Sequence, residues 1–202
     1  MVRECWFDCF PNPDARLLPP FSDVQRRYAE PHRHYHTTSH IREVVLAVSG
    51  AVRPHNPSPE LMLAAILHDV VYDPRAADNE ERSAEYAREL LASLEVPRGR
   101  REEAARLILL TKRHDPAAGD ESGRALIDAD LAILGADPTR YDAYAEAIRK
   151  EYAWVPEDQY RQGRRRVLER FLARPDIYRT SWMKPREPLA RANLAREIAS
   201  LS

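Results

Sequence analysis

Prolines and glycines divide the chain into short segments, and this division limits what it can fold into. The 202 residues include 16 prolines and 6 glycines, and between these breaks the apolar residues recur with helical periodicity. No convincing run alternates between apolar and polar side chains as a half-buried strand would. Ser58-Pro59 is typical of a helix start, and Gly135 of a helix end. We therefore expect an all-α protein, with helices at about 22–30, 37–52, 58–72, 79–94, 100–114, 123–134, 138–152, 156–173 and 187–201.

The length of the chain fits one domain, or a domain with a C-terminal extension. We expect a single domain over residues 1–202, with a helical core at about 22–152 and further helices at about 153–202. Segment 175–188 is either an ordered arm over this body or a mobile linker, and its sequence does not decide between the two.

Composition argues against several classes of protein. The net charge is -1, since 31 basic residues nearly cancel 32 acidic ones, which argues against a nucleic-acid binder driven by bulk charge. No stretch is long and apolar enough for a membrane span, and the N-terminus lacks the apolar stretch of a signal peptide. The two cysteines, Cys5 and Cys9, are too few for a disulfide framework. We expect a cytoplasmic protein with reduced cysteines.

Two histidines lie on helix faces that are otherwise apolar. His68 lies in the middle of one stripe, and His40 extends a second stripe by one turn. A single histidine on such a face is usually a hydrogen-bonded core residue. Asp69, directly after His68, is harder to explain, because a buried carboxylate needs a partner, a metal or a raised pKa. The stripes consist of Leu61, Ala64, Ala65, Val71 and Tyr72, and of Val44, Ala47, Val48 and Ala51.

A third helix places an acid among apolar side chains. Within residues 125–134, Asp130 lies within roughly 20° of the apolar direction and Asp128 roughly 140° from it, at about 100° per residue. We expect Asp130 in the core and Asp128 solvated or capping its neighbours. Two inward histidines and two inward aspartates, from three helices, suit a divalent transition metal. The apolar direction is defined by Leu126, Ile127, Leu131, Ile133 and Leu134.

The same residues carry a resemblance to a known family. His40, the doublet His68-Asp69 and Asp130 follow the order of the motif that defines the HD superfamily. The wider text resembles a bacterial group of predicted metal-dependent HD phosphohydrolases over nearly the whole chain. The segments concerned are EPHRHYHTTSHI (30–41), AILHDVVYD (65–73), DNEERSAEYA (78–87), TKRHD (111–115), DADLAILGAD (128–137), IRKEY (148–152) and ARANLAREI (190–198).

This resemblance implies an HD-domain-like helical bundle, a divalent metal ion and the hydrolysis of phosphate esters. By position, His40, His68, Asp69 and Asp130 match the four metal ligands of the superfamily. The resemblance does not indicate whether the ion is Mn, Fe, Co, Ni, Zn or Mg, nor whether a second ion joins it.

Three further residues are candidates for catalysis. Glu80 faces inward from the first turn of its helix, where it could orient water or act as general acid or base. It could equally be an acid favoured by the helix dipole. Asp73 is a rival for the same task. His114 could protonate the leaving group or join a second metal, although a cation at a helix C-terminus is also favoured without any function.

The run 32–36 contains three histidines and one arginine just before the helix of His40. Arg33 and His36 are the candidates for binding phosphate there, because they lie nearest the helix N-terminus. A polar loop is an equally good explanation of each residue alone. His36 also lies four residues before His40 and resembles one of a ligand pair, but we place it beside the metal ligands.

These features together predict a metal-dependent hydrolase of phosphate esters in a nucleotide or another small phosphorylated metabolite. The alternatives are a nucleoside triphosphate pyrophosphohydrolase and a metal-stabilised nucleotide-binding domain with little turnover. A di-iron oxygenase would need His36 or His114 as additional ligands. We expect no membrane or nucleic-acid partner, and a homodimer is compatible with the sequence.

Overall fold

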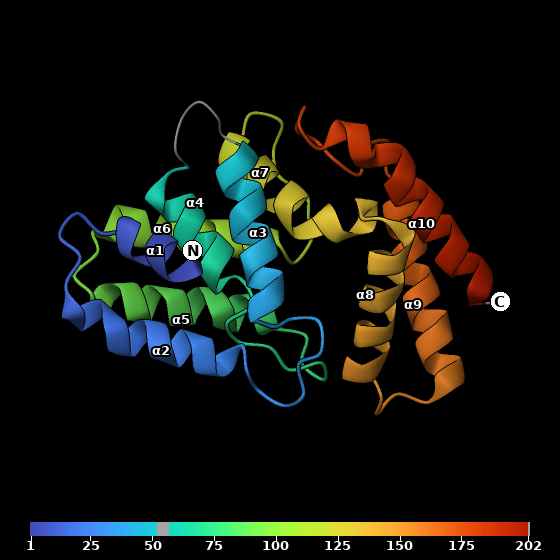
Figure 1. Ribbon diagram of the computed structural model, residues 1–202, viewed down its shortest axis with the longest axis horizontal. Helices are drawn as coiled ribbons and strands as arrows, with labels where there is room; N and C mark the ends of the chain where they lie inside the picture. The colour runs from blue at the N-terminus through green and yellow to red at the C-terminus, as the bar shows by residue number, and fades with distance from the viewer. Residues whose placement is uncertain (52–56, 202) are drawn as a thin grey trace. The chain divides into compact units, whose positions relative to one another are not determined.

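A computed structural model describes residues 1–51 and 57–201 of the chain. Within them the chain forms ten α-helices and no strand, which confirms the expected all-α class. The helices are α1 (Val2–Asp8), α2 (Leu18–Arg27), α3 (Thr38–Ala51), α4 (Pro59–Leu67), α5 (Asn79–Ser93), α6 (Arg98–Leu110), α7 (Glu121–Asp130), α8 (Pro138–Glu151), α9 (Glu157–Leu172) and α10 (Glu187–Ser200) (Figure 1). Short 3-10 helices are η1 (Ala15–Leu17), η2 (Leu131–Gly135) and η3 (Lys184–Arg186).

Most expected helices are present, and the differences lie at their ends. The predicted helix 58–72 ends at Leu67, the predicted helix 100–114 ends at Leu110, and the predicted helix 123–134 becomes a 3-10 helix at Leu131. Helix α1 was not predicted. The predicted end of the second helix, Val52, lies outside the described residues.

The chain divides into two compact units, Met1–Ala129 and Asp130–Ser202. The division falls between the last two residues of α7. The expectation of a single domain with its core at about 22–152 is not tested by this division and stays a prediction.

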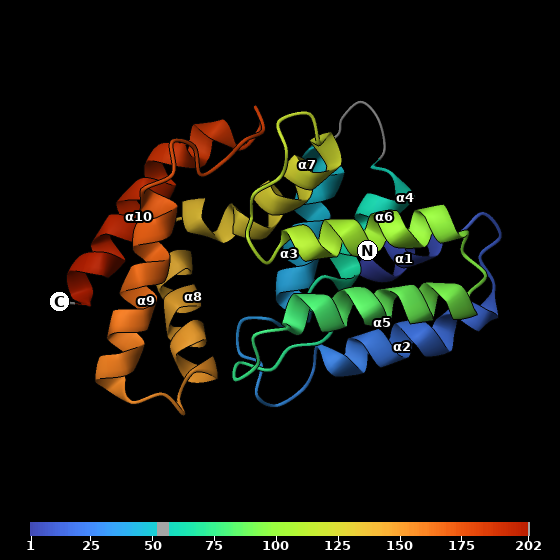
Figure 2. The same cartoon turned by 180° about the vertical axis from the view of Figure 1, so that it is seen from behind.

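Helix α4 is the centre of the first unit. Every residue from Leu61 to Leu67 is buried, and α1, α3, α5 and α6 all contact this helix. A helix that is apolar on all sides belongs in the middle of a bundle. Its start is as expected, because the Ser58 hydroxyl accepts a hydrogen bond from Leu61 N (3.2 Å). Figure 2 shows α5 and α6 running side by side on one flank of this unit.

The two cysteines lie in and just after α1, and both are free thiols. The Cys9 thiol donates a hydrogen bond to the Cys5 carbonyl (3.1 Å), and burial raises the pKa of Cys9 to about 12. A thiol with so high a pKa is a packing residue with little nucleophilic character.

In the second unit, α10 packs against α9 and η2. A buried ion pair joins α9 to α10, since Arg164 donates to Glu197 through Nε (2.7 Å) and Nη2 (3.1 Å). The Glu187 carboxylate accepts the backbone N–H groups of Ile177 and Tyr178 (3.0 Å each). Segment 175–188 is therefore ordered within this unit, which decides between the two interpretations of its sequence.

None of the helices in the described part of the chain combines the length and the apolar character that a membrane span requires.

Candidate metal centre

Two helix ends bring the predicted histidine ligands together. His40 is the third residue of α3, and His68 follows the last residue of α4. Their Nε2 atoms lie 3.2 Å apart, and both residues are buried, with 2% and 1% of their surface exposed. Residues 28 positions apart in the chain thus present two ring nitrogens to the same point.

The His68 ring is oriented by its own helix. Its Nδ1 atom lies 3.1 Å from the Ala65 carbonyl oxygen. A carbonyl only accepts hydrogen bonds, so this contact requires the proton of His68 on Nδ1. When the ring is neutral, as metal binding requires, the lone pair is then on Nε2, the atom that faces His40 and Asp69. A metal-binding histidine is usually held in this way, with the second ring nitrogen donating to a carbonyl or carboxylate.

The end of α7 adds a carboxylate. Asp130 is the last residue of that helix and is half-buried. One ligand atom each from His40, His68 and Asp130 lie within 4.8 Å of one another, and these three residues could hold a metal ion. In residues 1–51 and 57–201 no other group of three or more His, Cys, Asp or Glu side chains meets that condition.

Asp69, the fourth predicted ligand, lies outside this group of three but contacts both histidines. Its Oδ2 atom is 3.2 Å from His68 Nε2 and 3.6 Å from His40 Nε2, and its side chain is 18% exposed. Burial alone would raise the pKa of Asp69. The charge of His68 and hydrogen bonds from both histidines outweigh burial and hold the pKa well below its usual value. The carboxylate is therefore ionised at neutral pH.

The spacing and the chemistry of these donors fit a divalent metal. Two ligands that each lie about 2.1 Å from one ion are separated by roughly 3.0–3.4 Å in tetrahedral or octahedral geometry. The separations of 3.2, 3.2 and 3.6 Å among His40, His68 and Asp69 are close to that range. Imidazole and carboxylate donors together suit Mn, Fe, Co, Ni or Zn.

A buried arginine holds the turn that carries Asp69. Arg33 Nη1 donates to the carbonyls of Asp69 (2.7 Å) and His36 (3.2 Å), and Nη2 donates to the carbonyl of Val70 (3.1 Å). Its Nε pairs with Glu30 (3.1 Å), and the Arg33 side chain is 0% exposed. The carbonyls of Asp69 and Val70 follow the end of α4 and have no helical partner, so the guanidinium supplies their hydrogen bonds.

The prediction that Arg33 binds phosphate does not agree with this position. The Arg33 guanidinium donates to backbone carbonyls inside the protein and is not exposed to a substrate. We correct its role to that of a positioning residue for Asp69 and His36.

Tyr28, which directly follows α2, and Ser83 of α5 hold the same turn. The Tyr28 hydroxyl donates to the Ile66 carbonyl (2.9 Å) and accepts from Asp69 N (3.2 Å). The Ser83 hydroxyl accepts from Val71 N and donates to Val71 O, both at 3.1 Å. These tertiary bonds satisfy backbone groups that a longer α4 would have paired, which is why the helix ends before residue 72. Neither residue was predicted, because no local sequence signal marks a partner 12 positions away, as for Ser83, or 38 and 41 positions away, as for Tyr28.

The remaining predicted residues lie outside the group of three ligands. The His36 ring stacks on Tyr72 (4.2 Å between centroids) and meets the His40 ring edge-on (5.9 Å), so it lies beside a ligand as expected. Glu80 is half-buried in the first turn of α5. His114 is half-buried after α6 in a left-handed conformation (φ 52°).

Asp73 is exposed and organises the loop before α5. Its carboxylate accepts from Arg75 N (2.9 Å), and its backbone N–H and carbonyl both bond to the Asn79 side chain (3.0 and 2.8 Å). The catalytic roles of Glu80, Asp73 and His114 stay predictions.

Asp128 corrects one part of the sequence argument. We expected it to be solvated and Asp130 to be the more buried, but Asp128 is 0% exposed and Asp130 is only half-buried. All residues from Ala125 to Ala129 are buried, so α7 is covered on all sides. A projection with a single apolar direction therefore ranks the burial of these acids wrongly.

No protein-family model, curated protein or solved structure matches this chain.

Proposed function

We propose that this protein is a metal-dependent phosphohydrolase of the HD type, acting on a phosphate ester in a nucleotide or another small phosphorylated metabolite. The convergence of the His40 and His68 Nε2 atoms with the carboxylates of Asp69 and Asp130 carries this proposal. We propose that the chain belongs to the HD superfamily, which its HD motif and all-helical class support. We also propose that it is a cytoplasmic protein.

A divalent ion at this site supplies Lewis acidity, which lowers the pKa of water and polarises a phosphoryl oxygen. His40, His68, Asp69 and Asp130 would hold it, and we favour one transition-metal ion per chain. The ionised Asp69 also contributes negative charge, which favours a cation at this point.

Glu80 is the proposed general base or water-positioning residue. No hydrogen bond or ion pair engages its side chain within the described residues, in contrast to the neighbouring Glu81, which pairs with Lys112. The Glu80 carboxylate therefore has no ion pair to break before it positions a water.

The test is to purify the protein, load it separately with Mn, Fe, Co, Ni and Zn, and measure bound metal by elemental analysis. Each form is then assayed against nucleoside mono-, di- and triphosphates and small phosphorylated metabolites. His68→Ala should lose both metal and turnover. His32→Ala provides a matched control, because His32 is 42% exposed and outside the group of ligands, so its metal content should stay at the wild-type level.

The products separate the related possibilities. Release of orthophosphate supports the phosphohydrolase, and release of pyrophosphate from triphosphates supports a pyrophosphohydrolase. Metal binding with tight nucleotide binding but no turnover would indicate a metal-stabilised binding domain. If the protein binds none of the five metals, the proposal of a metal-dependent enzyme is contradicted.

A further inference from the structure

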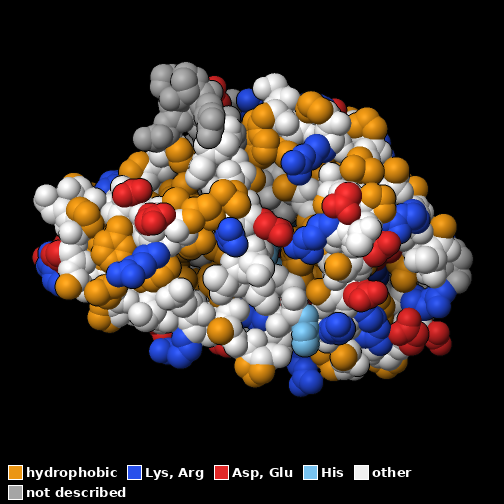
Figure 3. Space-filling model, viewed as in Figure 1, with side chains coloured by type: hydrophobic (Ala, Val, Ile, Leu, Met, Phe, Trp, Pro, Cys, Tyr) orange, Lys and Arg blue, Asp and Glu red, His pale blue; other side chains and the backbone are white. Residues whose placement is uncertain are grey.

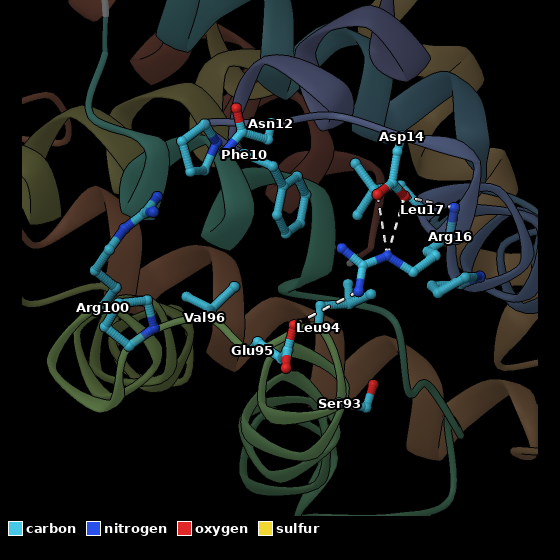
Figure 4. A pocket seen from close by; sticks show the side chains of 13 residues that line it. Phe10, Asn12, Asp14, Arg16, Leu17, Ser93, Leu94, Glu95, Val96 and Arg100 are labelled. Atoms are coloured by element: carbon cyan, nitrogen blue, oxygen red, sulfur yellow. Dashed lines mark hydrogen bonds and ion pairs between the residues drawn. The ribbon is translucent and has the colours of Figure 1, made fainter.

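A cavity lies in the first unit, between segment 10–20 and the turn that joins α5 to α6 (Figure 4). Its volume is about 470 Å³, within the range of roughly 300–1,000 Å³ that is typical of small-molecule sites. In Figures 1 and 2 these two segments lie together at the end of the unit where α5 ends. At this end the surface mixes apolar side chains with charges of both signs (Figure 3).

The inner wall of the cavity is apolar. It includes Phe10, Leu17, Leu94 and Val96, together with three prolines from the two segments. The Phe10 ring projects into the space between Val96 and the Arg16 guanidinium (Figure 4). Such a wall suits a ligand with an apolar body, since burial of apolar surface supplies most of the affinity of small ligands.

The mouth of the cavity carries two carboxylates that share one guanidinium. Arg16 Nε lies 3.0 Å from Asp14 Oδ2, and Arg16 Nη1 lies 3.5 Å from Glu95 Oε2. One negative charge is therefore in excess at this edge. The Arg16–Glu95 contact is long, and both side chains are largely exposed (76% and 81%), so a ligand cation can replace it readily.

Glu95 occupies a position where the backbone favours glycine. Its φ is 58°, and the bonds Glu95 N to Ala92 O (3.0 Å) and Val96 N to Leu91 O (2.9 Å) form the Schellman motif that ends α5. A glutamate in this left-handed conformation is strained relative to glycine. The strain is tolerated at a residue whose carboxylate lies at the mouth of a cavity, and backbone strain often accompanies binding sites.

We propose that this cavity binds a small hydrophobic amine. The apolar body lies against Phe10, Leu94 and Val96, and the ammonium pairs with the Glu95 carboxylate.

This site is distinct from the metal centre and does not depend on the proposed hydrolase activity. Arg100 of the cavity wall binds Glu60, in the first turn of α4. His68, at the other end of α4, lies about 12 Å further along that helix at 1.5 Å per residue.

A matched series of probes tests the proposal on the full-length protein. 2-Phenylethylamine, 2-phenylethanol and phenylacetate share a phenyl ring and differ in charge, and each is titrated while backbone amide signals are followed by NMR. We expect saturable shifts at Asn12, Leu94 and Val96, with the amine bound most tightly. If no probe shifts these signals, or if phenylacetate binds as tightly as the amine, the proposal is overturned.

Two variants separate binding from stability. Glu95→Gly removes the carboxylate and relieves the strain, so it should raise Tm by roughly 2–4 °C and weaken amine binding about tenfold. Glu95→Gln should weaken binding equally at unchanged Tm. Glu89→Gln, an exposed exchange on the same helix and outside the cavity, is the control and should keep wild-type affinity. Unchanged amine affinity in both Glu95 variants would remove the carboxylate from the site and overturn the proposal.

Discussion

Replacement of Arg33 by lysine tests whether the turn that carries Asp69 must be held for the proposed metal centre to form. Arg33 donates to the carbonyls of His36, Asp69 and Val70 from one planar group. Lysine keeps the positive charge, but its ammonium is a single point and cannot reproduce the arginine fork. The variant therefore removes geometry while it preserves charge.

The expected magnitude follows from the hydrogen bonds that are lost. The Arg33 side chain is 0% exposed, so at least one of the three carbonyls is left without a partner in a buried place. An unsatisfied buried polar group costs about 1–3 kcal/mol, and we expect a loss of roughly 3 kcal/mol in the free energy of unfolding. In a chain of this length that lowers Tm by about 6–12 °C. Metal affinity should fall about 10- to 100-fold, as it does when residues that orient ligands are lost.

Arg164→Lys is the matched control for this variant. Arg164 is also a buried arginine, which donates to Glu197 through two nitrogens and to the Tyr144 hydroxyl (3.2 Å), but it contacts no proposed ligand. Both variants should lose thermal stability, whereas only Arg33→Lys should lose metal affinity in a competition titration with a chromophoric chelator. The visible spectrum of the Co²⁺-loaded protein should change in Arg33→Lys alone.

One result would refute this reasoning. If Arg33→Lys has a lower Tm but its affinity for Zn²⁺ and Co²⁺ stays within about threefold of the wild-type value, the hydrogen bonds of Arg33 stabilise the fold and do not position Asp69. That outcome would not contradict the proposed hydrolase function, because the function is tested by separate assays of metal content and turnover.

Three further predictions concern single carboxylates. Asp130→Ala should lose metal and turnover together, whereas Asp128→Ala should keep its metal and lower Tm, because Asp128 is 0% exposed; elemental analysis and thermal melts check both, and metal loss in Asp128→Ala alone would reverse the assignment. Glu80→Gln should retain metal and lose roughly 10²- to 10⁴-fold in rate if this residue positions or deprotonates water, and a rate near wild type would return it to a helix-terminal role. Hydrogen bonds from two backbone N–H groups and Arg191 outweigh burial and lower the pKa of Glu187 from 4.5. Its stabilising effect is therefore present above about pH 4.5 and lost as the pH falls through the lower folded-state pKa. Denaturant unfolding of wild type and Glu187→Gln should accordingly differ near pH 6 and converge toward pH 3, and a difference that grows on acidification would contradict this.

The helical class and the burial of the two candidate histidine ligands were predictable from the chain alone, because both depend on local pattern. Periodicity and breaks define where helices form, and Ser58 caps α4 as its sequence indicated. A histidine within an apolar stripe must be buried if the stripe is buried, and His40 and His68 are. These inferences need only the geometry of single helices.

The tertiary structure decided where those helices end, which acidic side chains are buried, and which groups the polar side chains bind. α4 stops at Leu67 because Arg33, Tyr28 and Ser83 supply partners to the following backbone groups, and these residues are distant in the chain. Asp128 is buried because α7 is covered on all sides, which one helix projected alone does not reveal. The partner of a side chain depends on what the rest of the chain packs against it. Arg33 therefore donates hydrogen bonds to backbone carbonyls, whereas its sequence context had suggested that it binds phosphate.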